Sequence, residues 1–203
     1  GHAFASYLAF KNNLDPECPL GMETAETHSM SMEFFCWKFI DKFFAGRAND
    51  YKYKHLLDSL SFLTYGTVVD AFQHIVYENP DMTPAERNAA WNDLEAKFRP
   101  YLNTNGMRYF EKGTRWQYQM HIYESPFYYI DYCLAQSDAL QFLFASLENY
   151  GDAFNRYYKF TSHYGSEFFT DMLKEVGIKS PFEKGALKEV AEKSEKLLKE
   201  LEK

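Results

Sequence analysis

The amino-acid sequence predicts an all-helical fold, and two observations support this. Apolar residues recur at the spacing of an α-helix through most of the 203 residues. The segments 83–86 (Thr-Pro-Ala-Glu) and 180–183 (Ser-Pro-Phe-Glu) each have the pattern of a capping box with proline in the first helical position. Hydrophobic residues make up 46% of the chain and aromatic residues 19%, enough for a buried core. We therefore expect one multi-helix domain, or part of one, over residues 1–203.

Helix-breaking residues divide the first half of the chain. The segment 15–21 contains two prolines and a glycine, so the first helix must end there. Asn79 and Pro80 end the third helix, and Gly66 inside that helix leaves a break open. The expected helices cover residues 3–14, 22–45, 50–78 and 83–102.

A loop and a mixed segment come next. Residues 103–114 contain Gly106 and Gly113 and are expected to form a loop. Over residues 116–122 apolar and polar side chains alternate, which permits a short strand or hairpin-like element. The remaining helices are expected over residues 125–147, 152–163 and 167–176, and after the second capping box.

Charge and composition exclude several classes of protein. The chain has 22 basic and 29 acidic residues and a formal net charge of −7, and its basic residues form no stripe that could follow a nucleic-acid backbone. No apolar run approaches the roughly 20 residues that span a bilayer, and the first residues lack the pattern of a signal peptide. Cys18, Cys36 and Cys133 are too widely spaced for a disulfide framework or a cysteine zinc site. We expect a soluble, cytoplasmic protein with reduced thiols and no nucleic-acid or membrane partner.

Two segments near the N-terminus carry the strongest chemical signal. In an HExxH motif, two histidines four residues apart on one helix bind zinc, and the glutamate after the first is the general base. Gly1 and His2 correspond to the fourth and fifth positions of such a motif, whose first histidine and glutamate would then precede residue 1. The run 26–33 (Glu-Thr-His-Ser-Met-Ser-Met-Glu) follows on the next expected helix and begins with Glu26, a residue type that zinc accepts as a third ligand.

Five segments extend this signal along the chain: GHAFASYLA, ETHSMSMEFF, VDAFQHIVYENP, RWQYQMHIYESPFYYIDYCLAQ and KSPFEKGALKEV. In this order they resemble the oligoendopeptidase F and thimet-oligopeptidase family of zinc metallopeptidases. The resemblance implies that residues 1–203 are the C-terminal part of a zincin-like helical catalytic domain, starting inside HExxH. It also implies one zinc ion, short peptides as substrates, and the N-terminal remainder of the same enzyme as a partner. Other divalent ions can occupy such ligand sets.

The resemblance assigns the metal ligands to two residues of this chain. His2 would bind the zinc, and Glu26 would be the third ligand, with Glu23 one turn earlier as its rival. A surface glutamate near a helix start is the alternative for Glu26. Glu33, two turns after Glu26, would lie behind the ligands and orient a ligand histidine, with a buried structural ion pair as the alternative. His28 lies off that face and is either a binding residue or a polar residue packed between helices.

A histidine followed by closely spaced tyrosines forms the second part of the implied site. In the family, imidazole and phenol donors stabilise the oxyanion that forms at the scissile carbonyl. His121, Tyr128 and Tyr132 are therefore the catalytic candidates, although Tyr129 can share a helix face with Tyr132 equally well and is a candidate substrate contact. Arg115 would either pair with a substrate carboxylate or lock a loop to a helix. An aromatic core stripe is the alternative for the tyrosines.

The function implied by the resemblance is zinc-dependent endopeptidase hydrolysis of short peptides. Residues 1–203 offer at most two of the three implied ligands and lack the general base, so we expect the isolated chain to be inactive. A non-catalytic helical binding or scaffold module derived from a peptidase is the alternative. An HExxH sequence in front of Gly1 in a longer gene product would exclude that alternative.

Overall fold

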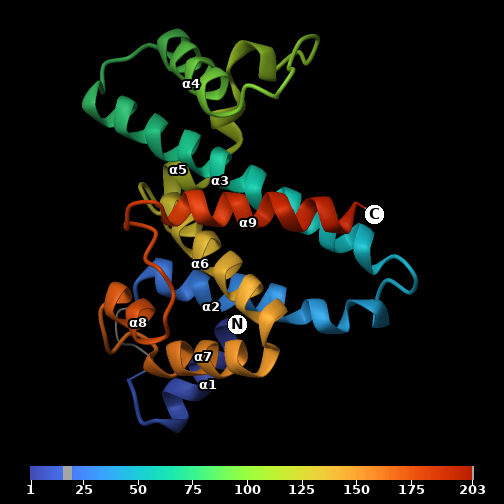
Figure 1. Ribbon diagram of the computed structural model, residues 1–203. Coiled ribbons are helices and arrows are strands. Elements are labelled where there is room, and N and C mark those ends of the chain that lie inside the picture. The colour runs from blue at the N-terminus through green and yellow to red at the C-terminus, as the bar shows by residue number, and fades with distance from the viewer. Residues whose placement is uncertain (16–19, 203) are drawn as a thin grey trace. The chain divides into compact units, whose positions relative to one another are not determined.

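The computed structural model describes residues 1–15 and 20–202, and every regular element within them is a helix (Figure 1). The predicted all-helical class is therefore confirmed. The chain divides into two compact units. The first unit contains Gly1–Leu60 and Leu134–Lys203, and the second contains Ser61–Cys133. The helices α3 (Ala48–Glu78) and α6 (Tyr129–Glu148) contribute residues to both units.

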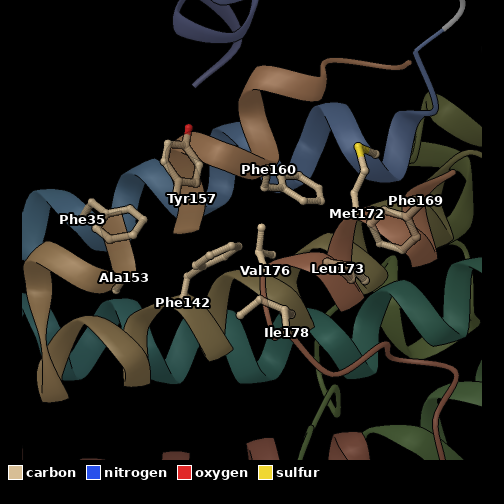
Figure 2. Packing of buried hydrophobic residues seen from close by; sticks show 10 residues of the cluster. All are labelled: Phe35, Phe142, Ala153, Tyr157, Phe160, Phe169, Met172, Leu173, Val176 and Ile178. Carbon is tan, nitrogen blue, oxygen red and sulfur yellow. The ribbon is translucent and has the colours of Figure 1, made fainter. Parts of the chain in front are cut away.

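The first unit is built around an aromatic core. Besides its parts of α3 and α6 it contains α1 (His2–Lys11), α2 (Met22–Phe35), the 3-10 helix η1 (Cys36–Lys42), α7 (Tyr150–His163), α8 (Phe169–Glu175) and α9 (Ala186–Leu201). Figure 2 shows Phe35, Phe142 and Tyr157 converging, with ring centroids 5.1 Å apart for Phe35 and Tyr157 and 5.8 Å apart for Phe142 and Tyr157. All three are almost fully buried, and each such side chain contributes about 1.5–3 kcal/mol through burial. This core joins α2, α6 and α7.

The second unit has its own core. It contains α4 (Pro84–Phe98), the 3-10 helices η2 (Phe110–Lys112) and η3 (Arg115–Tyr118), and the short helix α5 (His121–Glu124). Phe72 of α3 packs edge-on against Trp91 of α4, with ring centroids 5.2 Å apart, and also against Trp116 of η3. The Trp116 indole Nε1 donates a hydrogen bond of 2.9 Å to the Asn88 Oδ1, so this buried ring is paired at its polar edge.

The two capping-box patterns behave differently. At Thr83 the box is complete, since the Thr83 backbone N–H donates to the Glu86 side chain and the Glu86 N–H donates to Thr83 Oγ1. At Ser180 the glutamate side chain accepts from the Ser180 N–H, but the segment forms a turn and α9 begins only at Ala186. Gly185 separates the two with a φ of 88°, which an α-helix cannot contain. The last helix therefore follows the capping-box segment, as expected, but does not begin within it.

Several predicted boundaries also shift. The helix expected to reach residue 45 ends at Phe35 and continues as η1, whose three-residue repeat buries Trp37 and Ile40 on one side. The fourth helix ends at Phe98 instead of residue 102, because Arg99 precedes a proline and leaves the helical region. The helix expected from residue 125 starts at Tyr129, after Phe127 with its φ of 64°.

The strand permitted at residues 116–122 is absent from the structure. This segment contains η3 and α5, and the described residues offer no other strand that could pair with it. Most of the predicted loop at 15–21, including Cys18, lies outside the described residues, whereas Cys36 and Cys133 are free thiols. None of the described helices is long and apolar enough to cross a membrane.

Gly66 lies inside an unbroken α3, which resolves the break that its position left open. A Cβ at residue 66 would overlap the sulfur of Cys133, so the glycine permits close packing of α6 against α3 within the second unit. The Cys133 thiol also lies 3.8 Å from the Leu63 carbonyl oxygen.

We expect Gly66→Ala to destabilise the second unit by about 1–3 kcal/mol, although alanine is the better helix former by about 1 kcal/mol. The steric overlap outweighs the gain in helix propensity, because residues 66 and 133 both belong to packed helices. The net change in stability is therefore a loss. Urea denaturation should show that the same substitution in a Cys133→Ala background is neutral or stabilising, since the sulfur is gone. A Gly66→Ala protein as stable as the parent would contradict this account.

Candidate active site

The His2 imidazole and the Glu26 carboxylate meet where the first two helices cross. His2 Nε2 lies 3.6 Å from Glu26 Oε2. A Cβ at Gly1 would overlap the His28 carbonyl oxygen, so glycine at this position lets α1 begin directly against α2. Further along α1, at helical spacing from Gly1, Ala5, Leu8 and Ala9 are buried and anchor the helix. The close approach of the two side chains is thus a consequence of helix packing.

The 3.6 Å between these two atoms is close to the spacing of two ligands on one metal ion. Two donor atoms on a tetrahedral zinc lie about 3.3–3.5 Å apart, given bonds of about 2.0–2.2 Å. The Ser29 hydroxyl donates to Glu26 Oε2 at 2.9 Å and so restrains the carboxylate. Within residues 1–15 and 20–202, no three histidine, cysteine, aspartate or glutamate side chains gather as a metal site. The spacing of His2 and Glu26 is therefore compatible with two zinc ligands, and the described residues place no third candidate ligand beside them.

Glu23, the rival ligand, has a different surrounding. Its carboxylate turns back towards Gly21, so close that a Cβ on that glycine would overlap it. Glu23 is the acidic residue in the first turn of α2, where a negative charge is favourable at a helix N-terminus. Of these two carboxylates, only that of Glu26 contacts His2.

Glu33 is held by His55, a histidine that no sequence pattern links to the site. Its Oε2 lies 3.1 Å from His55 Nε2, and His55 Nδ1 accepts a 2.9 Å hydrogen bond from the Trp37 indole. An indole N–H can only donate, so Nδ1 is the acceptor and Nε2 carries the proton towards Glu33. The Phe34 ring stacks on the imidazole at 4.7 Å. Residues 33 and 55 lie on different helices, and no spacing rule links them.

His28 is a core residue in the structure. It is fully buried, and its ring packs edge-on against Phe160 with centroids 5.5 Å apart. Burial lowers the pKa of His28 to about 3. Its carbonyl oxygen accepts a hydrogen bond of 2.7 Å from the Tyr157 hydroxyl. These contacts correspond to the packing alternative, with a neutral imidazole.

In the second unit, His121 and three tyrosines form one cluster. The His121 ring lies 5.9 Å from Tyr128, 5.0 Å from Tyr129 and 5.9 Å from Tyr132 between centroids. The Tyr128 hydroxyl donates to the Tyr132 hydroxyl at 2.8 Å. Two phenol oxygens and an imidazole are therefore brought together by the start of α6 and the short helix α5.

Gln119 orients the His121 ring and was not foreseen from the sequence. Its Oε1 accepts from the Tyr65 hydroxyl at 2.8 Å, which leaves its amide nitrogen facing His121 Nδ1 at 2.7 Å. An amide nitrogen can only donate, so Nδ1 accepts and Nε2 carries the ring proton. This tautomer makes His121 Nε2 a hydrogen-bond donor, as an oxyanion contact requires.

Tyr129 differs from its neighbours. It is only 9% exposed and belongs to the apolar core of the second unit, where it packs edge-on against Tyr65. Burial raises its pKa far above the ordinary value of a phenol. Tyr128 and Tyr132 are half-buried and share the hydrogen bond between their hydroxyls.

Arg115 contacts aromatic rings of its own unit. Its guanidinium lies 4.8 Å from the centre of the Tyr65 ring and 5.5 Å from that of Phe110. Cation–π contacts of this kind hold η3 against α3 and η2. The geometry resembles the second of the two predicted roles, in which the arginine locks a loop to a helix.

Comparison with known proteins decides the family. The model of peptidase family M3 matches residues 1–192. The chain belongs to peptidase family M3. A search of curated proteins found no match.

Three solved structures are similar to this member of family M3. A protein assigned as oligoendopeptidase F is 43% identical, with a TM-score of 0.93 over 98% of this chain and 35% of its own. PZ peptidase A, solved with an inhibitor, is 44% identical with the same TM-score and the same coverage. A protein assigned as oligoendopeptidase F from Bacillus anthracis str. Ames is 38% identical, with a TM-score of 0.81 over 97% of this chain and 32% of its own. The chain thus spans about a third of the length of these relatives.

Proposed function

We propose that this chain is the C-terminal part of the catalytic domain of a zinc metalloendopeptidase that hydrolyses short peptides. The observation that carries the proposal is the 3.6 Å approach of His2 Nε2 to Glu26 Oε2, within a chain of peptidase family M3. The names of the relatives, oligoendopeptidase F and PZ peptidase A, support the substrate class.

In this proposal His2 and Glu26 hold the zinc, together with a histidine from an upstream HExxH segment. The bound metal would supply Lewis-acid polarisation of the peptide carbonyl and activation of a water molecule. Ser29 keeps the Glu26 carboxylate in place through its 2.9 Å hydrogen bond. By themselves, residues 1–203 offer two ligands and no general base, so we expect the isolated chain to bind zinc weakly and to have no peptidase activity.

His121 and a tyrosine pair act as hydrogen-bond donors to the oxyanion in this proposal. His121 donates through Nε2, because Gln119 occupies Nδ1. Tyr128 and Tyr132 form this pair: the Tyr128 hydroxyl donates to the Tyr132 hydroxyl at 2.8 Å, which leaves the Tyr132 O–H to donate to the oxyanion. Donors that are held before the reaction stabilise the developing charge without reorganisation.

The test is the metal content of the full-length protein after Glu26→Gln. We expect bound zinc to fall about tenfold or more, with a parallel loss of peptide hydrolysis, because the neutral amide is a poor zinc ligand. Glu23→Gln, three residues earlier on the same helix, is the matched control and should retain the metal. Elemental analysis after dialysis measures the outcome. A Glu26→Gln protein with unchanged zinc would remove Glu26 from the ligand set, and a parent protein without zinc or hydrolysis would favour a non-catalytic module.

A further inference from the structure

A tight turn over residues 125–128 joins α5 to α6. The Tyr128 N–H donates to the Ser125 carbonyl oxygen at 3.2 Å and closes the turn. Pro126 occupies the second position of the turn, and Phe127, with a φ of 64°, occupies the third. A proline followed by a positive φ is the pattern of a type II turn, whose third position favours glycine. A phenylalanine there is strained, so contacts outside the turn must hold it in this conformation.

Helix α3 supplies these contacts to both the backbone and the ring of Phe127. The Phe127 N–H donates a hydrogen bond of 2.8 Å to the Gln73 Oε1. The Phe127 ring packs against the rings of His74 and Tyr77, with centroids 5.0 Å and 4.9 Å apart. All of these residues belong to the second unit, which also contains the cluster of His121 and the tyrosines. The strained residue is therefore clamped to α3 at two points.

The Gln73 side chain is fixed in the orientation that the bond to Phe127 requires. It is only 1% exposed, so water does not compete for its oxygen. Its Nε2 donates to the Val69 carbonyl oxygen, 3.4 Å away and one turn earlier in α3. Because a backbone N–H can only donate and a carbonyl oxygen can only accept, Oε1 faces Phe127 and Nε2 faces Val69. Gln73 is thus a fixed acceptor for one backbone group outside its own helix.

The turn also connects the imidazole of the candidate site to its phenols. On one side, the Ser125 N–H donates to the His121 carbonyl oxygen at 3.0 Å. On the other side, the Ser125 carbonyl oxygen accepts from Tyr128, and the Tyr128 carbonyl oxygen accepts from the Asp131 N–H at 3.0 Å in the first turn of α6. A displacement of the turn would therefore move Tyr128 and Tyr132 relative to His121.

We propose that Gln73 is a positioning residue, which holds Tyr128 and Tyr132 against His121 by fixing the strained turn at Phe127. This inference rests on the proposed function, because it concerns the placement of the groups that stabilise the oxyanion. Gln73 acts through the backbone N–H of Phe127. Strained backbone of this kind persists only where the surrounding structure fixes it, and a displacement of about 1 Å in an active site can cost about 10²-fold in rate.

The kinetic test uses the full-length enzyme with Gln73→Met, which keeps the length of the side chain and removes its acceptor. We expect kcat per bound zinc to fall about tenfold or more, with KM within about twofold of the parent. Gln73→Glu keeps an oxygen that can accept from Phe127 and should recover most of the lost kcat. Gln141→Met is the matched control, because the Gln141 Oε1 accepts from the Lys179 N–H at 2.9 Å in the first unit. It should leave kcat per bound zinc unchanged.

An enzyme without the two phenol hydroxyls separates positioning from folding. In a Tyr128→Phe/Tyr132→Phe background, Gln73→Met should change kcat by less than about twofold, because the groups that it positions are gone. A variant that only reduced the amount of folded enzyme would lower the rate equally in both backgrounds. Such an equal loss would overturn the proposal, and so would an unchanged kcat of Gln73→Met, a Gln73→Glu enzyme as slow as Gln73→Met, or an equal fall in Gln141→Met.

Hydrogen exchange at the Phe127 amide, followed by mass spectrometry of the same full-length proteins, does not depend on hydrolysis. We expect exchange about tenfold faster in Gln73→Met, because the N–H has lost its acceptor. Unchanged exchange, or faster exchange with an unchanged kcat, would overturn the proposal, since the contact would then be absent or only structural. Failure of the proposed function is recognised separately, from a parent protein that lacks zinc or hydrolysis before any variant is compared.

Discussion

Replacing Tyr132 by phenylalanine in the full-length enzyme should lower kcat by about 10²- to 10³-fold while leaving the bound metal unchanged. The substitution removes a single hydroxyl, which lies 2.8 Å from the hydroxyl of Tyr128, and retains the ring contacts with Phe62 and Tyr129. An interaction that exists only in the transition state reduces kcat and kcat/KM together when it is lost. Steady-state kinetics and elemental analysis of the same sample measure both quantities.

The neighbouring tyrosines provide the control for this prediction. Tyr128→Phe should also reduce kcat, because its hydroxyl is bonded to that of Tyr132. Tyr129→Phe should leave kcat within about twofold, because the Tyr129 ring is part of the apolar core. A silent Tyr132→Phe enzyme with its full metal content would reduce Tyr132 to a packing residue. Damage confined to Tyr129→Phe would show that the start of α6 presents its other face to the reacting carbonyl.

His121→Ala is expected to behave like Tyr132→Phe, and a loss of zinc in His121→Ala would contradict the separation of roles. Substitutions at Glu26 should remove metal, whereas those at His121 and Tyr132 should remove transition-state stabilisation only. The contrast between the two classes is what assigns each residue its role.

Local patterns predicted the elements of this fold better than their ends. The capping box at Thr83 marks a real helix start because both of its hydrogen bonds form within four residues. The same pattern at Ser180 forms its side-chain bond but not the helix, because Gly185 adopts a backbone conformation that only the folded structure reveals. At Gly66 the sequence pattern left a helix break open, but α3 remains intact. The glycine instead makes room for the side chain of Cys133, which is 67 positions away in the sequence.

The candidate site depends on tertiary contacts that local patterns cannot encode. Family resemblance, and not spacing, selected Glu26 over Glu23, and the approach of Glu26 to His2 follows from the crossing of two helices. His55 escaped detection because its partners Glu33 and Trp37 belong to other elements. Gln119 was missed because no sequence spacing marks a glutamine that orients a nearby histidine. The catalytic and metal-binding roles themselves stay predictions until the variants are measured.

A buried carboxyl group on α6 makes the stability of the first unit depend on pH. Asp138 is completely buried, and neither of its oxygens accepts a hydrogen bond of good geometry within the described residues, although the Thr27 hydroxyl lies close enough to act on the carboxyl group. Burial raises its pKa well above the ordinary value of 3.8, and the Thr27 hydroxyl opposes this rise only in part. Between pH 3.8 and the raised pKa, the folded chain keeps this proton while the unfolded chain has released it. The stabilising contribution of Asp138 is therefore complete below pH 3.8 and is lost as the pH rises.

Asp138→Asn should abolish this loss, because the amide has the shape of the protonated carboxyl and cannot ionise. We expect the free energy of unfolding of the variant, minus that of the parent, to increase by about 1.4 kcal/mol for each pH unit above about pH 4, until the raised pKa is reached. Urea denaturation of both proteins at several pH values measures the slope, which is independent of any constant cost of placing the amide in the core. Asp81→Asn, at an exposed position after α3, controls for the change in net charge. A difference between Asp138→Asn and the parent that does not vary with pH would mean that the Asp138 carboxyl is ionised in the folded chain and has a partner that compensates its burial.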